Sequence, residues 1–268
     1  MPIITISRGS YSKGKEIAEK LADKLGYKCI SRDLLLETSK DFHVPEIKLV
    51  RALHDAPSIL DRFTYGKERY VAFIHEALLE SVKEGKVIYH GLAGHFLLKD
   101  IPHIMKVRII ANFEDRVKEE MKRENIDEDK ARYILKKDDD ERRKWSLALY
   151  GIDTSDASLY DMVLHIETLT VDDVVEIIAR AVKLPHFQTT PESQSILNDM
   201  LVAARIEVAL IKEYPTVKVR CSKNDCIVTV RAAPSQQDKI STRVKEIVGE
   251  IKGVKGIKIV IDPIITAD

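Results

Sequence analysis

Short apolar runs alternate with amphipathic stretches over the first two thirds of the chain. Residues 3–7 form a β-rich apolar run that stops just before Gly9. Beyond Glu16, apolar residues recur at the spacing of one helix face, at Ile17, Ala18, Leu21, Ala22 and Leu25. Gly26 follows as a helix stop signal. The chain is therefore predicted to open with a strand, a glycine loop and a helix.

The same alternation continues to about residue 182. It predicts further strands at 27–31, 86–90, 105–111 and 162–166, and helical regions at 70–82, 114–145 and 171–182. Strands that alternate with helices form a parallel sheet with helices on both faces. The predicted fold class is α/β, and ligands of such sheets bind at the carboxyl ends of the strands, where the Gly9 loop falls.

A polar stretch bracketed by Pro185 and Pro191 then interrupts the pattern. After it the sequence predicts a helix at 192–212, a hairpin with a turn at 222–225, an amphipathic helix at 240–251 and a strand at 257–261. We expect two domains, 1–185 and 192–268, the second a small αββαβ module.

The charge balance and the length of the apolar runs limit the kinds of partner that we expect. Lys plus Arg and Asp plus Glu both number 43, so no net charge attracts nucleic acid, and we expect no nucleic-acid partner. No apolar run reaches the roughly 20 residues that span a bilayer, and no signal-peptide pattern opens the chain. We expect a cytoplasmic protein without a transmembrane segment.

Three cysteines are too few for a disulfide framework, and no histidines accompany them in a metal-binding pattern. We expect free thiols. Cys221 and Cys226 are placed to face each other across the predicted hairpin, so a disulfide between them is the alternative.

The first seven positions of the phosphate-loop pattern G-x-x-x-x-G-K-[ST] are filled by Gly9, Ser10, Tyr11, Ser12, Lys13, Gly14 and Lys15. Glycines let the backbone N–H groups curl around phosphate oxygens, and Lys15 would place a catalytic charge on the β- and γ-phosphates of ATP. Glu16 stands where a hydroxyl residue usually binds magnesium, so the motif is imperfect. A plain glycine turn with an exposed lysine is the alternative.

Residues 6–22 resemble the opening of the cytidylate kinase-like family, whose members commonly have Gly, a basic residue and Glu where this chain has Gly14, Lys15 and Glu16. The resemblance continues through 32–33, 87–91, 140–143 and 160–164, and covers about the first 185 residues. It implies a P-loop nucleoside monophosphate kinase that uses ATP and Mg²⁺. The implied phosphate acceptor is CMP or dCMP.

The resemblance also implies roles for single residues. Arg32, Asp33 and Gly91 would bind the monophosphate, and Asp33 would also act in catalysis through the monophosphate or a magnesium-bound water. A helix cap is the alternative for Asp33. Cytidylate kinases carry an arginine after the glycine that ends the third strand, whereas this chain has Leu92, which leaves the acceptor open.

Asp140 and Arg143 match the family's mobile lid, with Arg143 as the cation that stabilises the transition state. A solvated charged helix is the alternative for this region. His90 and His95 have no paired ligand, and we expect both to be structural.

Residues 192–262, with the ending Gly253-Val254-Lys255-Gly256-Ile257, resemble the BON domain, which implies contact with a surface or a protein partner. Stabilisation of the kinase domain is the alternative. No catalytic grouping occurs in it. Two other functions therefore stay open: an ATP-binding regulator that signals through this module, and a kinase for a non-nucleotide small molecule.

Overall fold

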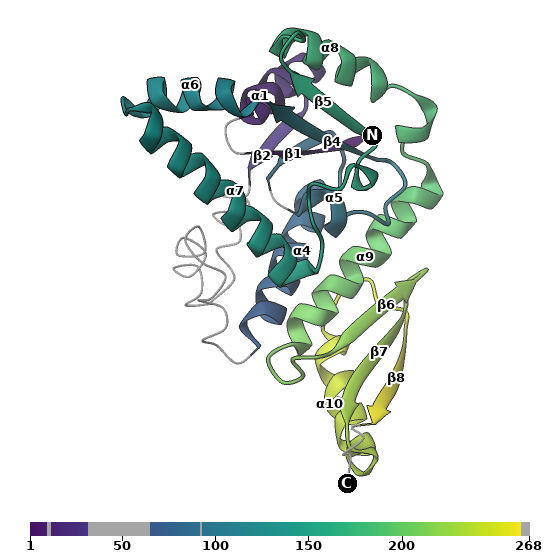
Figure 1. The fold of residues 1–268 in the computed structure, drawn as a ribbon. Coiled ribbons are helices and arrows are strands. Elements are labelled where there is room, and N and C mark those ends of the chain that lie inside the picture. Colours follow the sequence, from purple (N-terminus) through teal and green to yellow (C-terminus); the bar gives the residue numbers. More distant parts are fainter. Residues whose placement is uncertain (10–11, 32–64, 92, 264–268) are drawn as a thin grey trace. The chain divides into compact units, whose positions relative to one another are not determined.

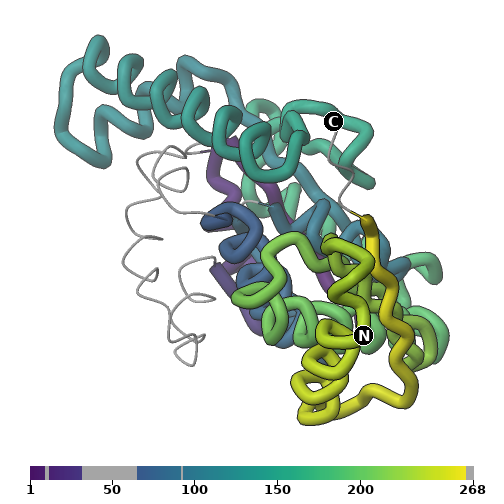
Figure 2. Tube along the Cα trace, turned by 90° about the horizontal axis from the view of Figure 1, so that it is seen from below, coloured from purple at the N-terminus to yellow at the C-terminus, as the bar shows by residue number. Residues whose placement is uncertain are grey.

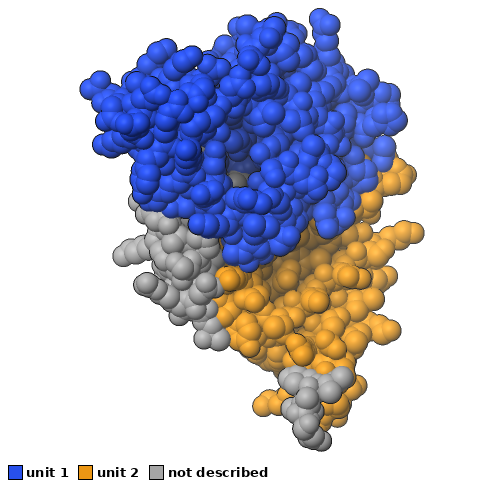
Figure 3. Space-filling view, in the orientation of Figure 1, with its two compact units in different colours: residues 1–59, 84–190 blue, residues 60–83, 191–268 orange. Residues whose placement is uncertain are grey.

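The computed structural model describes residues 1–9, 12–31, 65–91 and 93–263. The chain divides into two compact units, coloured in Figure 3. Residues 1–59 and 84–190 make up the first unit, and residues 60–83 and 191–268 make up the second. Among the described residues, no helix is long and apolar enough to cross a membrane.

A five-stranded parallel sheet forms the centre of the first unit, in the order β2-β3-β1-β4-β5 (Figure 1). Its strands are β1 (Ile3–Arg8), β2 (Lys28–Ser31), β3 (Val87–His90), β4 (Ile104–Ala111) and β5 (Met162–Ile166). Ile3, Ile4 and Ile6 of the central strand are almost completely buried, because both faces of β1 are covered. The predicted α/β fold class is confirmed.

Helices cover both faces of this sheet. On one face lie α1 (Gly14–Leu25) and α8 (Val171–Ala181), which share an apolar core with β1 and β4 and are joined by an ion pair between Lys20 and Asp172. On the other face lies the short α5 (Gly94–Leu97), which contacts β1. The helices cover the faces of the sheet, and the loop between β1 and α1 lies at the carboxyl end of β1.

The charged helical region predicted at 114–145 consists of two helices, α6 (Phe113–Glu124) and α7 (Glu128–Tyr150), which form a hairpin (Figure 2). Asn125 ends α6 in the left-handed conformation, with φ 52°. Asp127 begins α7, because its carboxylate accepts a hydrogen bond from the backbone N–H of Lys130 at 2.8 Å.

The second unit contains the three-stranded sheet β6-β7-β8. Its elements are α9 (Pro191–Leu210), β6 (Lys218–Ser222), β7 (Asp225–Ala232), α10 (Gln237–Gly249) and β8 (Gly256–Pro263), in the predicted order αββαβ. One face of the sheet shares an apolar core with α9 and α10, built around Val202, Ile206, Val228 and Val244. The likeness to a BON domain stays a prediction.

The helix α4 (Gly66–Val82) packs against α9 in this second unit, although the sequence assigned residues 70–82 to the first domain. Arg205 of α9 binds Glu80 of α4 at 2.6 Å, and the Gln194 side chain donates to the carbonyl of Lys83 at 3.0 Å. Independent folding of residues 1–185 and 192–268 stays a prediction.

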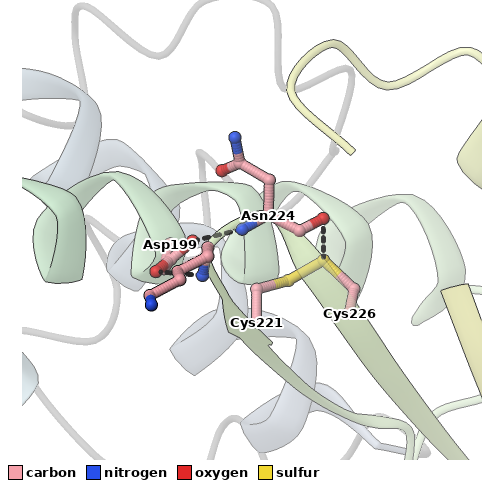
Figure 4. The surroundings of a disulfide bond; sticks show 5 residues. Asp199, Cys221, Asn224 and Cys226 are labelled. Atoms are coloured by element: carbon pink, nitrogen blue, oxygen red, sulfur yellow. Dashed lines mark hydrogen bonds between the residues drawn. A yellow bond between two sulfur atoms is a disulfide. The ribbon is translucent and has the colours of Figure 1, made fainter. Parts of the chain in front are cut away.

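Cys221 and Cys226 form a disulfide, so the expectation of free thiols is wrong for this pair (Figure 4). Lys223 and Asn224 both have positive φ, which makes a tight two-residue turn between β6 and β7. The turn places the two cysteines directly opposite each other, with their Cα atoms 4.1 Å apart. Cys29 is a free thiol.

A buried carboxylate holds the same turn to α9 (Figure 4). Asp199 is 8% exposed, and it accepts hydrogen bonds from the backbone N–H groups of Lys223 and Asn224, each at 2.8 Å. These charge-assisted bonds satisfy two turn donors that point toward the helix.

Replacing Asp199 by alanine should lower the free energy of unfolding of the second unit by about 2–3 kcal/mol, because two backbone donors lose a charged acceptor. Urea unfolding of the full chain measures this loss. Asp262→Ala removes an exposed carboxylate from β8 and is the matched control. Equal stability of the two variants would contradict the role given to Asp199.

Candidate active site

The loop between β1 and α1 is fastened to β4. The Gly9 N–H donates to the carbonyl of Ile109 at 3.4 Å. Ser12 is fully buried, and its hydroxyl lies 3.1 Å from the carbonyl oxygens of both Gly9 and Ile109. Lys13 then turns into the left-handed region, with φ 60°, and α1 begins at Gly14. Ser10 and Tyr11 lie outside the described residues.

Position 14 has room only for glycine. A Cβ atom there would lie 2.8 Å from the Cβ and 2.9 Å from the Cδ of Arg8. The first helical hydrogen bond among the described residues runs from the Ile17 N–H to the Lys13 carbonyl at 3.0 Å. The N–H groups of Gly14, Lys15 and Glu16 precede this bond and have no acceptor within the helix. Such N–H groups bind phosphate oxygens.

Lys15 and Glu16 both point along the exposed side of α1. The ammonium of Lys15 lies 3.7 Å from Glu19, and its side chain is 62% exposed. The carboxylate of Glu16 lies 3.5 Å from Lys20, one turn away from the loop. Exposed ion pairs contribute at most about 1 kcal/mol, so a phosphate can draw Lys15 away from Glu19.

Arg116 of α6 was not predicted from the sequence, yet it lies beside the loop. Its guanidinium comes within 3.8 Å of where a Cβ of Gly9 would be, and it binds Asp139 of α7 at 2.7 Å with its side chain only 10% exposed. It follows the carboxyl end of β4 by one helical turn, and this placement was the available signal. Arg116 of α6 therefore lies between the loop and α7, the helix that carries the predicted lid residues Asp140 and Arg143.

A pocket of about 260 Å³ opens beside Lys13 and Arg116. Its lining combines the apolar side chains of Ala111 and Ile166 with charged side chains of both signs. Lys118 pairs with Asp115 at 3.3 Å and Lys122 pairs with Glu119 at 3.9 Å, and Glu167 adds a further carboxylate. The pocket therefore offers apolar contact beside Lys13 and Arg116, but its walls carry no uniform positive charge.

The predicted lid residues Arg143 and Asp140 lie on the exposed surface of α7. Arg143 donates from Nε to the carboxylate of Asp153 at 2.9 Å, and its side chain is 63% exposed. The pKa of Asp153 is lowered first by hydrogen bonds from Ser155 and then by Arg143, so the carboxylate is ionised near neutral pH. Asp140 is exposed, and the neighbouring Asp139 is the residue that reaches Arg116.

Of the remaining predicted residues, Gly91, His90 and His95 belong to the described part of the chain. Gly91 follows β3, and its N–H donates to the carbonyl of Ile6 at 3.3 Å, which places it next to the phosphate-loop strand. Arg32, Asp33 and Leu92 lie outside the described residues. His90 and His95 are buried, as expected of structural histidines. Among the described residues no group of His, Cys, Asp or Glu could by itself hold a metal ion.

The sequence matches the cytidylate kinase-like family over residues 3–168. The chain belongs to this family. The family match confirms the prediction of a nucleotide kinase, and it stops short of the C-terminal αββαβ module.

Cytidylate kinases are among the relatives of this family member. That of Pyrococcus horikoshii is 26% identical over 183 residues, which cover 67% of this chain and 88% of that kinase. That of Sulfurisphaera tokodaii is 38% identical over 96 residues, which cover 35% of this chain and 52% of that kinase. A crystal structure of an uncharacterised protein from Eubacterium ventriosum superimposes with a TM-score of 0.54 at 22% identity over 68% of this chain and 98% of that protein, which supports the fold.

Replacing Gly14 by alanine in this kinase should weaken ATP binding about tenfold or more, because the added Cβ collides with Arg8 and overpacking costs about 1–3 kcal/mol. Gly249→Ala is the matched control, since a Cβ there meets no atom within 4 Å. Titration with a fluorescent ATP analogue measures both affinities. If Gly14→Ala bound ATP as well as the control does, α1 would not be the phosphate site.

Proposed function

We propose that this chain transfers the γ-phosphoryl group of ATP to a nucleoside monophosphate, with CMP or dCMP as the acceptor. The observation that carries the proposal is the start of α1, where three N–H groups without intrahelical acceptors and the exposed Lys15 follow a loop that excludes side chains at position 14.

The triphosphate of ATP would lie on the N–H groups of residues 14–16, with Lys15 on its outer phosphates. The pocket beside Lys13 and Arg116 would take the nucleoside part of ATP, because that part is uncharged and the pocket offers apolar contact from Ala111 and Ile166 among polar side chains of both signs. Gly9 and Ser12 act through the backbone, which they fix by their bonds to Ile109.

Mg²⁺ fits this site as an ion held mainly by the phosphates. Magnesium commonly takes one or two carboxylates and keeps several waters, so a dedicated protein cage is unnecessary. When bound, it neutralises charge on the phosphates during transfer. Of the candidate carboxylates, Asp33 follows β2 in the sequence, and Glu16 lies in the first turn of α1 but pairs with Lys20.

The acceptor would bind at the carboxyl ends of β2 and β3, where Arg32, Asp33 and Gly91 follow in the sequence. Asp140 and Arg143 would close over it from α7. CMP is favoured by the family and by the names of the relatives. A cation other than one at position 92 would have to hold the monophosphate, because Leu92 cannot donate the forked hydrogen bonds of an arginine.

Leu92 also favours a second candidate, an ATP-binding regulator that has lost transfer to monophosphates and signals through its αββαβ module. The third candidate, also compatible with Leu92, is a kinase that transfers phosphate to a non-nucleotide small molecule. Both alternatives keep the ATP loop, so they differ from the proposal only in whether phosphate is transferred and to which acceptor.

Lys15→Ala should reduce phosphoryl transfer about a hundredfold to a thousandfold, which is typical of removing one positioned charge, and it should leave folding intact. The measurement is turnover of the full chain with labelled ATP against each nucleoside monophosphate. Lys24→Ala is the control, because Lys24 lies on the same helix and makes only an exposed ion pair.

CMP or dCMP should be the best acceptor in this assay. A wild-type chain that binds ATP but transfers phosphate to no monophosphate would refute the proposal and leave the regulator and the kinase for a non-nucleotide acceptor. Turnover that survives in Lys15→Ala would refute the role of the loop.

A further inference from the structure

A buried polar cluster in the first unit lies outside the site described so far. At its centre is the hydroxyl of Tyr160, which is 2.9 Å from the carbonyl oxygen of Thr154, 3.1 Å from Ser7 Oγ, and 3.2 Å from both His95 Nε2 and Arg108 Nη1. A phenol hydroxyl has one proton and two lone pairs, so these contacts occupy it fully.

The cluster joins four separate segments of the chain. Ser7 belongs to β1, two residues before the phosphate loop, and it is the register partner of Arg108 on β4. His95 belongs to α5, and Thr154 and Tyr160 belong to the stretch that connects α7 to β5. Tyr160 is thus the point where the loop after the predicted lid meets the strand that carries the phosphate loop.

The cluster is built to stay fixed. His95 is 2% exposed, and burial, assisted by Arg108 and then Lys106, lowers its pKa to about 3. The imidazole is therefore neutral at physiological pH, and Arg108 is the one charge in the cluster. Arg108 also donates to the carbonyl of Thr154 and lies 5.5 Å from the centre of the Tyr160 ring.

The loop that this cluster fixes also holds Arg143. Asp153 precedes Thr154, and its carboxylate accepts three hydrogen bonds. Two come from Ser155, from the backbone N–H at 2.9 Å and from the side-chain hydroxyl at 2.8 Å, and the third comes from Nε of Arg143 at 2.9 Å. Among the described residues none bonds the two terminal nitrogens of Arg143. Asp153 thus orients a guanidinium whose terminal pair is left for a phosphate group, the geometry of bidentate binding.

We propose that Tyr160 is a positioning residue for phosphoryl transfer, which sets Arg143 relative to the phosphate loop by tying the Asp153–Thr154 segment to β1. The proposal rests on the proposed kinase function and deepens it. A tyrosine that merely filled space would need its ring and not its hydroxyl, so Tyr160→Phe separates the two roles.

Two measurements on Tyr160→Phe test the proposal, with Tyr133→Phe as the control because Tyr133 is 68% exposed on α7. Hydrogen exchange at the Ser155 amide and the Arg143 Nε–H should become several-fold faster in Tyr160→Phe alone. In the transfer assay its kcat should fall about tenfold, the effect of about one hydrogen bond, with KM for ATP within about twofold.

A double-mutant cycle with Arg143→Ala completes the test, since Tyr160→Phe should cost little more once Arg143 is gone. Unchanged exchange, unchanged kcat, or the same loss with and without Arg143 would each overturn the proposal. If the wild-type chain transferred no phosphate, the proposed function and the catalytic role of Tyr160 would both fall. The exchange measurement would then decide separately whether Tyr160 holds the loop.

Discussion

The close approach of the α1 backbone to Arg8 is the constraint on which the site depends. With 2.8 Å between the Arg8 Cβ and a Cβ at position 14, any side chain there would push the helix away from the strand end. The buried Ser12 hydroxyl holds the other side of the loop on β4. Gly9 and Ser12 are thus held on β4, and the first residue of α1 is held against Arg8 at the end of β1, which fixes where the N–H groups that begin α1 lie.

The charged groups around this fixed point are held with different strength. Lys15 makes one exposed contact with Glu19, which a phosphate dianion can replace at little cost. Arg143 is bonded to Asp153 through Nε, so its two terminal nitrogens can meet a phosphate without breaking that bond. Arg116 is mostly buried, and losing its carboxylate partner on α7 would be expensive. The proposed phosphoryl transfer would use such a combination of fixed and exchangeable cations, because the reaction depends on positioning and charge.

The sequence predicted the parts that have local signatures. The strand before Gly9, the helix after it and the αββαβ order of the second unit all follow from periodicity and turn residues. Features that depend on distant contacts were missed. The sequence around Arg116 does not indicate its partner on α7, and residues 70–82 do not indicate that they pack on α9. The hairpin made the Cys221–Cys226 disulfide an alternative, but free thiols were expected because a cytoplasmic compartment is reducing. The roles of Asp33 and Leu92 stay predictions, outside the described residues.

Backbone amide shifts recorded during a titration with ATP and magnesium test the central claim most directly. The account predicts that the largest changes fall on Gly9, Gly14, Lys15 and Glu16 at the loop, with a second group around Arg116. Gly9 opens the loop, the N–H groups of the other three residues begin α1 without intrahelical acceptors, and Arg116 lines the pocket beside the loop. ATP binding that left these amides unchanged and shifted others instead would contradict it.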